Sequence, residues 1–122
     1  MDELPSIEVK PTLEFRNSLR SLSKKYRKIR TDIEPVIEQI QMGCFLGNPI
    51  PGSPYCVYKV RILNSDVKKG KRAGYRLVYW VQTLETTTSI ILVTIYSKSD
   101  QETVRIHEIK EIIERFSLVP NS

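Results

Sequence analysis

The chain has 122 residues, which suits one domain with one core, because a division into two would leave neither half enough interior. With 40% hydrophobic and 27% charged residues it is too apolar for a disordered chain and too charged for a membrane protein, so we predict a single globular domain over residues 1–122. Its net charge of +5 favours a polyanionic partner or an acidic protein partner.

The chain opens with patterns for a short strand and a helix. Residues 5–10 alternate polar and apolar side chains ahead of Pro11, which predicts a strand that ends at the proline. Thr12 is a candidate N-cap for a helix over residues 12–26. The apolar stripe of this helix follows helical spacing: Phe15, Leu19, Leu22 and Tyr26.

A second helix and a loop follow. The apolar stripe of this helix consists of Ile29, Ile33, Val36, Ile37 and Ile40. Proline is best tolerated in the first turn of a helix, so Pro35 predicts a start near Thr31 or Asp32. Glycine, proline and asparagine are dense in residues 43–54, which predicts a loop within the domain.

The second half of the chain shows three strands and a final helix. Residues 56–63, 74–81 and 89–97 are rich in β-branched and aromatic residues, and residues 104–117 carry an amphipathic helical pattern. The predicted order is β-α-α-β-β-β-α. Because consecutive strands usually lie side by side, this order favours an α+β fold: an antiparallel sheet of about four strands, a helical pair packed on one face, and a C-terminal helix.

Cations alternate with apolar residues in the second predicted strand. Lys59 and Arg61 must share one face of the sheet, and we expect that face to be open, since a helix-covered face cannot hold two unpaired charges. The following segment adds cations against a single acid, Asp66. These cations are Lys68, Lys69, Lys71, Arg72 and Arg76. The cluster predicts an RNA-binding surface, while its loop members also fit a hairpin kept soluble by lysines.

Other polar and aromatic residues have weaker signals. Residues 16–30 carry seven cations and no acid, which fits the exposed face of a helix. Tyr96 and Lys98 end the last predicted strand on a common face, where a ring beside a cation suits an unpaired base. His107 is the only histidine, which excludes a histidine pair for acid–base chemistry, and we interpret it as a surface residue.

The sequence has no motif for a metal, nucleotide or other cofactor. It lacks GxxxxGK and GxGxxG motifs, a serine in a nucleophile elbow, and thiol, histidine and carboxylate residues at metal-ligand spacing. The longest apolar run, residues 90–93, is far shorter than the roughly 20 residues that span a bilayer, and residues 1–10 do not resemble a secretion signal. We therefore expect no cofactor and a cytoplasmic location, with Cys44 and Cys56 as reduced structural thiols.

Three segments form a recognisable set: residues 58–62 (YKVRI), 70–81 (GKRAGYRLVYWV) and 90–100 (IILVTIYSKSD). Together they resemble the sheet of RelE/ParE-superfamily toxins, and the RelE and HigB branch most closely. Their strongest element is the sequence AGYR of residues 73–76, which opens an apolar strand; with the two helices ahead, the resemblance covers about residues 6–100. It implies a RelE-like domain of a type II toxin–antitoxin system. Such a toxin cleaves mRNA on the ribosome without a metal, represses translation, and is neutralised by a cognate antitoxin encoded beside it.

The resemblance also implies a cationic catalytic site. By position, Lys59 and Arg61 match the two basic residues of the family's second strand, and Arg76 matches the arginine after its glycine. Lys98 falls where members often carry arginine or lysine. In the implied reaction a ribose 2′-hydroxyl attacks the adjacent phosphate, and cations stabilise the charge that gathers on the phosphoryl oxygens. Arg61 and Arg76 are expected to hold the phosphate, and Arg76 is expected on a solvent-facing surface.

The remaining roles concern proton transfer and base binding. Lys59 is expected to take the proton of the 2′-hydroxyl, which requires a lowered lysine pKa of the kind that neighbouring cations produce. Lys98 is expected to support the leaving oxygen, and Tyr96 to stack on a base.

One departure from the family pattern keeps other functions open. RelE-type toxins carry a tyrosine shortly after the last basic residue, whereas residues 100–105 contain none and Val104 occupies the corresponding position. One alternative is a non-catalytic inhibitor of the ParE type, which binds a protein target such as gyrase. Another is an inactive binding module with the same fold. We expect an acidic or amphipathic antitoxin segment to cover the basic sheet face.

Overall fold

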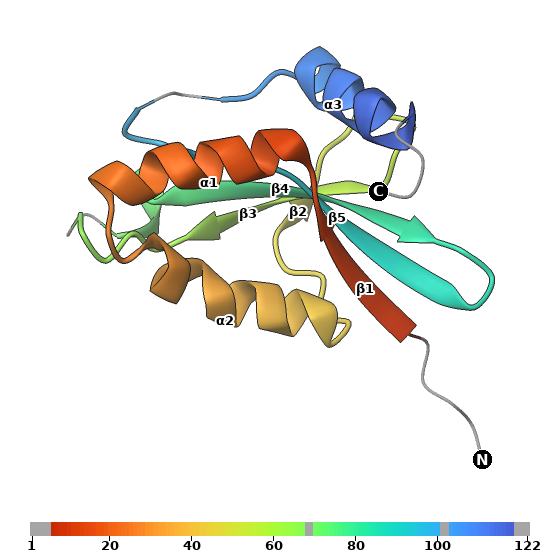
Figure 1. The fold of residues 1–122 in the computed structure, drawn as a ribbon, viewed down its shortest axis with the longest axis horizontal. Helices are drawn as coiled ribbons and strands as arrows, with labels where there is room; N and C mark the ends of the chain where they lie inside the picture. Colours follow the sequence, from red (N-terminus) through yellow and green to blue (C-terminus); the bar gives the residue numbers. More distant parts are fainter. Residues whose placement is uncertain (1–5, 68–69, 101–102, 119–122) are drawn as a thin grey trace.

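The computed structural model describes residues 6–67, 70–100 and 103–118. The described residues form an α+β domain, as predicted, with five strands and three α-helices (Figure 1). The strands are β1 (Ser6–Pro11), β2 (Asn48–Pro49), β3 (Val57–Ile62), β4 (Tyr75–Thr83) and β5 (Thr87–Ser97). The helices are α1 (Leu13–Lys25), α2 (Ile29–Gln41), α3 (Ile106–Leu118) and the short 3-10 helix η1 (Lys71–Ala73).

Thr12 joins β1 to α1 and caps the helix as the sequence predicts. Its hydroxyl accepts a hydrogen bond from the Phe15 N–H at 2.9 Å, which satisfies one of the free donors of the first turn. The same hydroxyl donates to the Val93 carbonyl of β5 at 2.7 Å. The Thr12 side chain therefore also connects the start of α1 to β5 by a hydrogen bond.

The sheet is mixed, with the strand order β1-β5-β4-β3-β2, and the prediction of an antiparallel sheet of about four strands is wrong in this respect. β1 pairs with β5 in parallel, while the pairs β2–β3, β3–β4 and β4–β5 are antiparallel. The first strand lies beside the last one, although consecutive strands usually lie together. Hydrophobic alternation shows which residues form a strand but not which distant strand becomes its neighbour.

The second helix begins at Ile29, earlier than predicted, so Pro35 lies inside it and not in its first turn. Tertiary contacts explain the longer helix. Ile29 is completely buried in the core, and the Asp66 carboxylate accepts a hydrogen bond from the Lys28 N–H at 3.1 Å. Pro35 is exposed, and its ring faces away from the core. Burial of the first turn outweighs the hydrogen bond that proline removes.

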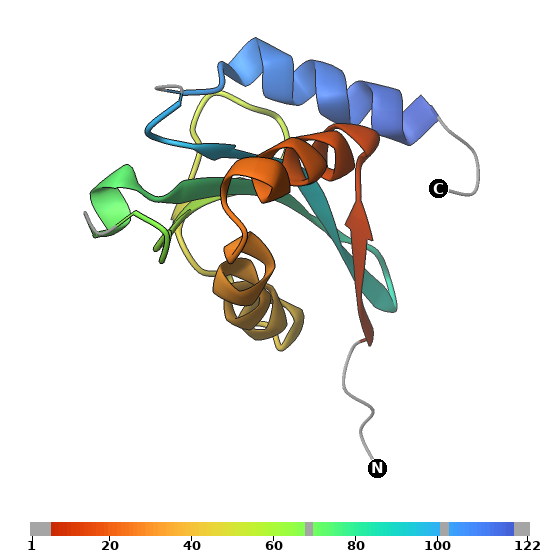
Figure 2. The same cartoon turned by 60° about the vertical axis from the view of Figure 1, so that its left-hand side comes forward.

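Apolar clusters cover both faces of the sheet: the predicted helical pair packs on one face, and the C-terminal helix packs on the other, so the helices do not all share one face. α1 and α2 pack against the face that carries Tyr75, Leu77 and Tyr79. α3 packs against the opposite face, which carries Val78 and Trp80. Figures 1 and 2 both place the C-terminal end of α3 beside the start of α1, where Arg115 pairs with Glu14 at 2.8 Å.

None of the helices in the described part of the chain combines the length and the apolar composition that crossing a bilayer requires. Both cysteines are free, and both are exposed, so neither contributes to the core as a structural thiol.

Candidate phosphate-binding cleft

Lys59 and Arg61 share one face of β3, as the alternation predicts. It is the face opposite α1 and α2, because the intervening Val60 packs into the cluster beneath those helices. α3 covers the part of this face around Val57 and Trp80. Arg61, by contrast, is exposed, and Lys59 is half-buried. The cations therefore lie at the end of the face that α3 leaves open.

The segment from Gly47 to Pro51 forms a wall beside these cations. Asn48 pairs with Lys59 across the β2–β3 ladder, and the Ile50 N–H donates to the Val57 carbonyl at 2.8 Å. Gly47 has a φ of +95°, and a Cβ there would overlap the Lys59 carbonyl. Glycine is required at this position, because only a residue without a side chain lets the segment approach β3 so closely.

The wall and the cations enclose a hollow of about 440 Å³. Its lining residues are Gly47, Asn48, Pro49, Ile50, Pro51, Lys59, Arg61 and Lys71. Three cations and no carboxylate belong to this lining. Among the described residues, no Asp or Glu forms a salt bridge with Lys59, Arg61 or Lys71. Such a concave site, whose charged lining residues are all cations, attracts an anion such as a phosphate group.

Arg76 lies directly opposite Arg61 in the β3–β4 ladder, but it is not on the surface as predicted. Its side chain is only 5% exposed. Nη1 donates to the carbonyls of Lys71 and Tyr75 at 3.0 and 3.2 Å, and Nη2 donates to the Arg72 carbonyl at 3.0 Å. Burial, together with the nearby charge of Arg61, lowers the pKa of Arg76. Three of its five donors hold the backbone of η1 and β4, so Arg76 positions Lys71 at the hollow.

Gly74 and Lys98 complete the same end of the sheet. A Cβ at Gly74 would overlap the Ile62 carbonyl, so glycine lets η1 pack closely against β3. The Lys98 N–H donates to the Gly74 carbonyl at 2.9 Å, which places Lys98 just beyond β5 and beside η1. The Lys98 side chain is exposed but is not part of the lining of the hollow.

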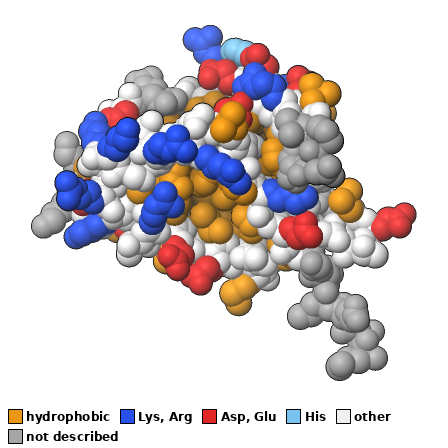
Figure 3. Space-filling model, in the orientation of Figure 1, with side chains coloured by type: hydrophobic (Ala, Val, Ile, Leu, Met, Phe, Trp, Pro, Cys, Tyr) orange, Lys and Arg blue, Asp and Glu red, His pale blue; other side chains and the backbone are white. Residues whose placement is uncertain are grey.

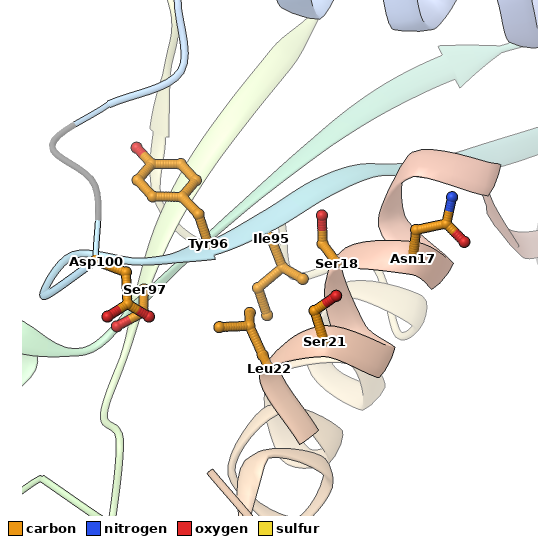
Figure 4. A pocket seen from close by; sticks show the side chains of 8 residues that line it. All are labelled: Asn17, Ser18, Ser21, Leu22, Ile95, Tyr96, Ser97 and Asp100. Atoms are coloured by element: carbon orange, nitrogen blue, oxygen red, sulfur yellow. The ribbon is translucent and has the colours of Figure 1, made fainter. Parts of the chain in front are cut away.

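Tyr96 does not offer a surface for base stacking, contrary to the prediction. It is 4% exposed and packs in the cluster beneath α3. Figure 4 shows its ring directed away from α1, at the edge of a second hollow of about 290 Å³ between α1 and the end of β5. This hollow is lined by serine and asparagine side chains and by Asp100, with no cation. It therefore does not suit a phosphate.

The structure thus brings together only part of the predicted site. Lys59, Arg61 and Lys71 meet at the hollow, and Arg72 is exposed beside it in η1. Lys68 and Lys69 lie outside the described residues. The sequence does not reveal the wall from Gly47 to Pro51, because one glycine and two prolines in five residues indicate a loop. Proline also occurs in edge strands, which is the one signal for a strand here.

No protein-family model matches the chain, and a search of curated proteins finds no significant match. Within the described ranges, no group of histidine, cysteine and carboxylate residues could hold a metal ion.

Proposed function

We propose that this protein is a cytoplasmic toxin of the RelE type that cleaves mRNA on the ribosome. The observation that supports the proposal most directly is the hollow lined by Lys59, Arg61 and Lys71 without a carboxylate. RNA is the polyanion that fits such a site and the overall positive charge of the chain. The resemblance of residues 58–62, 70–81 and 90–100 to the sheet of that family adds the reaction.

In the proposed reaction, the ribose 2′-oxygen forms a bond to the adjacent phosphorus, and the bond from phosphorus to the 5′-oxygen breaks. Arg61 and Lys71 hold the phosphoryl oxygens, where negative charge gathers in the transition state. The Lys59 amine accepts the proton of the 2′-hydroxyl. Lys98, whose exposed side chain lies outside the lining of the hollow, extends toward the leaving 5′-oxygen and supports its charge, and a water molecule returns a proton to that oxygen. Arg76 acts through the position of Lys71.

The test is cleavage of a transcript by purified protein on translating ribosomes, with mapping of the new 5′ ends. Wild type is compared with the double variant Lys59→Gln/Arg61→Gln and with a control, Arg105→Gln/Lys110→Gln, which removes the same charge near α3. Loss of transition-state contacts should reduce cleavage in the cleft variant by roughly 10²–10³-fold or more. The control should cleave like wild type. Full cleavage by the cleft variant would remove the site from the proposal.

A non-catalytic inhibitor of the ParE type, which binds a protein target such as gyrase, is the second candidate. The burial of Arg76 and Tyr96 favours this candidate, because two of the predicted site residues are then not free to act on RNA. Growth arrest by a wild-type protein that leaves transcripts intact would favour this candidate. Inhibition of gyrase supercoiling would then separate it from an inactive binding module.

We also propose that an antitoxin covers the cleft through an acidic or amphipathic segment, since positive charge at Lys59 and Arg61 attracts carboxylates. Co-expression with the neighbouring open reading frame and purification of the complex would test this. Association should weaken as salt rises and after Arg61→Glu. Association that responds to neither change would contradict the proposed surface.

A further inference from the structure

Three cations follow one row along the outer surface of α1. Arg16, Arg20 and Lys24 are spaced four residues apart, and all three are exposed. Residues with this spacing lie above one another on the same helix face, about 6 Å apart along the axis. We call these three residues the α1 row.

The turn that follows α1 extends this positive surface. It adds two further exposed cations, Arg27 and Lys28, and the start of α2 adds a third, Arg30. Figure 3 shows Lys and Arg side chains gathered over α1 and this turn, on the left-hand half of the view. Residues 16–30 contain no Asp or Glu. Positive charge therefore predominates over the helix and the turn, where the carboxylates of Asp100 and Asp66 contact Lys25 and the Lys28 N–H.

The α1 row lacks neutralising partners. In the described part of the chain, none of its three residues forms a salt bridge, whereas the neighbouring Lys25 pairs with Asp100 at 2.7 Å. Like charges four residues apart repel each other and weaken a helix. A polyanion that binds along the row would offset this repulsion.

We propose that the α1 row binds the sugar–phosphate backbone of duplex RNA. Surfaces that bind unpaired bases present aromatic rings for stacking, but the rings of this helix and its turn face the core: Phe15 is 4% exposed and Tyr26 is 5% exposed. Duplex RNA needs no such rings, because proteins recognise it mainly through its shape, phosphates and ribose hydroxyls. A straight row of cations matches one strand of a regular backbone.

The groove beside α1 disfavours an acidic protein as the partner. An acidic helix would place apolar anchors on the Phe15, Leu19 and Ile33 side chains that line this groove. Glu34 and Glu38 outnumber the one cation in the lining of the same groove, Arg30, so the groove would repel the acidic residues of that helix. RNA that lies along the α1 row does not have to enter the groove.

The α1 row and the cleft can contact different segments of RNA, because α1 packs on the sheet face opposite Lys59 and Arg61. The inference deepens the proposed function by assigning a second site to structured RNA, which is the main component of the ribosome. It rests on that function only for the identity of this RNA. Binding to a duplex would occur even if the cleft cleaved nothing.

The experiment measures binding of a fluorescent RNA duplex by anisotropy over a series of salt concentrations. The variant is Arg16→Gln/Arg20→Gln, and the charge-matched control is Arg105→Gln/Lys110→Gln. Log affinity falls as log salt rises, and each phosphate contact adds about one to the steepness of this fall. The slope of the row variant should therefore be less steep than that of wild type by about two. The control should keep the wild-type slope. Circular dichroism checks that each protein is folded.

Two results would overturn the inference: an unchanged slope in the row variant, or an equal loss in the control, which would mean that net charge alone matters. Displacement of the duplex by poly-glutamate of equal charge would also overturn it, in favour of an acidic protein. Failure of the proposed function looks different. If the wild-type protein leaves ribosomal transcripts intact, the proposed cleavage activity is wrong. If the wild type and the row variant still differ in salt slope, the α1 row remains an RNA-binding site.

Discussion

Arg61 and Arg76 lie directly opposite each other on β3 and β4, yet only Arg61 is exposed. Two like charges in such a pair repel each other. Arg76 is stabilised by three backbone carbonyls, which orient their negative ends toward its guanidinium. The pair therefore combines one cation that is free to bind a ligand with one that holds the loop carrying Lys71.

Replacing Arg76 should destabilise the fold as well as the cleft. Arg76→Ala removes three charged hydrogen bonds from a side chain that is 5% exposed. We expect a loss of about 1.5–3 kcal/mol in the free energy of unfolding, measured by urea denaturation. The exposed neighbour is the control, and Arg72→Ala should change stability by less than about 0.5 kcal/mol. Equal stability of Arg76→Ala and wild type would show that the guanidinium does not hold the loop.

Glycine at position 47 should be needed for both the wall and the hollow. Gly47→Ala places a Cβ against the Lys59 carbonyl at a φ of +95°, so we expect a loss of at least about 2 kcal/mol and weaker RNA binding. Gly70→Ala is the matched control, because Gly70 has a φ of +73° but no atom within 4 Å of the added Cβ. Gly70→Ala should lose only the backbone strain of about 1–3 kcal/mol, and less than Gly47→Ala, in which the overlap with the Lys59 carbonyl adds to a similar strain. Similar losses in both variants would argue against the close approach of β2 to β3.

The attachment of α3 should depend on apolar burial and not on its ion pair with α1. Arg115 and Glu14 have side chains that are 58% and 30% exposed, so Arg115→Gln should cost less than about 1 kcal/mol. Ile113 is completely buried, and Ile113→Ala should cost about 2–5 kcal/mol. Thermal and urea unfolding of both variants would check the difference. A larger loss of stability in Arg115→Gln than in Ile113→Ala would show that the ion pair, and not apolar burial, attaches α3.

The loop after β3 should be coupled to α2 through Asp32. Its carboxylate accepts hydrogen bonds from the N–H and the hydroxyl of Ser65 at 2.9 and 3.0 Å. A double-mutant cycle with Asp32→Ala and Ser65→Ala should give a coupling free energy of about 0.5–3 kcal/mol. Thr31→Ala, at an exposed position of the same helix, should show no coupling with Ser65→Ala. Additive effects of Asp32→Ala and Ser65→Ala would contradict the contact.

Local patterns in the sequence were sufficient to predict most elements and one face of the site. Thr12 as an N-cap, the strand over residues 57–62 and the common face of Lys59 and Arg61 all follow from the spacing of neighbouring residues. These features depend on the 3.6-residue and two-residue periods of helices and strands, which any short segment displays. The α+β class follows from the order of the elements.

Only the tertiary structure decided where distant segments meet. The parallel pairing of β1 with β5, the early start of α2 at the Asp66 carboxylate and the wall from Gly47 to Pro51 all depend on contacts between residues far apart in the chain. The burial of Arg76 and Tyr96 has the same origin: the register of β3, β4 and β5 places both on the face of Arg61, and η1 and the cluster beneath α3 cover them there. A sequence pattern reports the face on which a side chain lies, whereas exposure depends on what packs above that face.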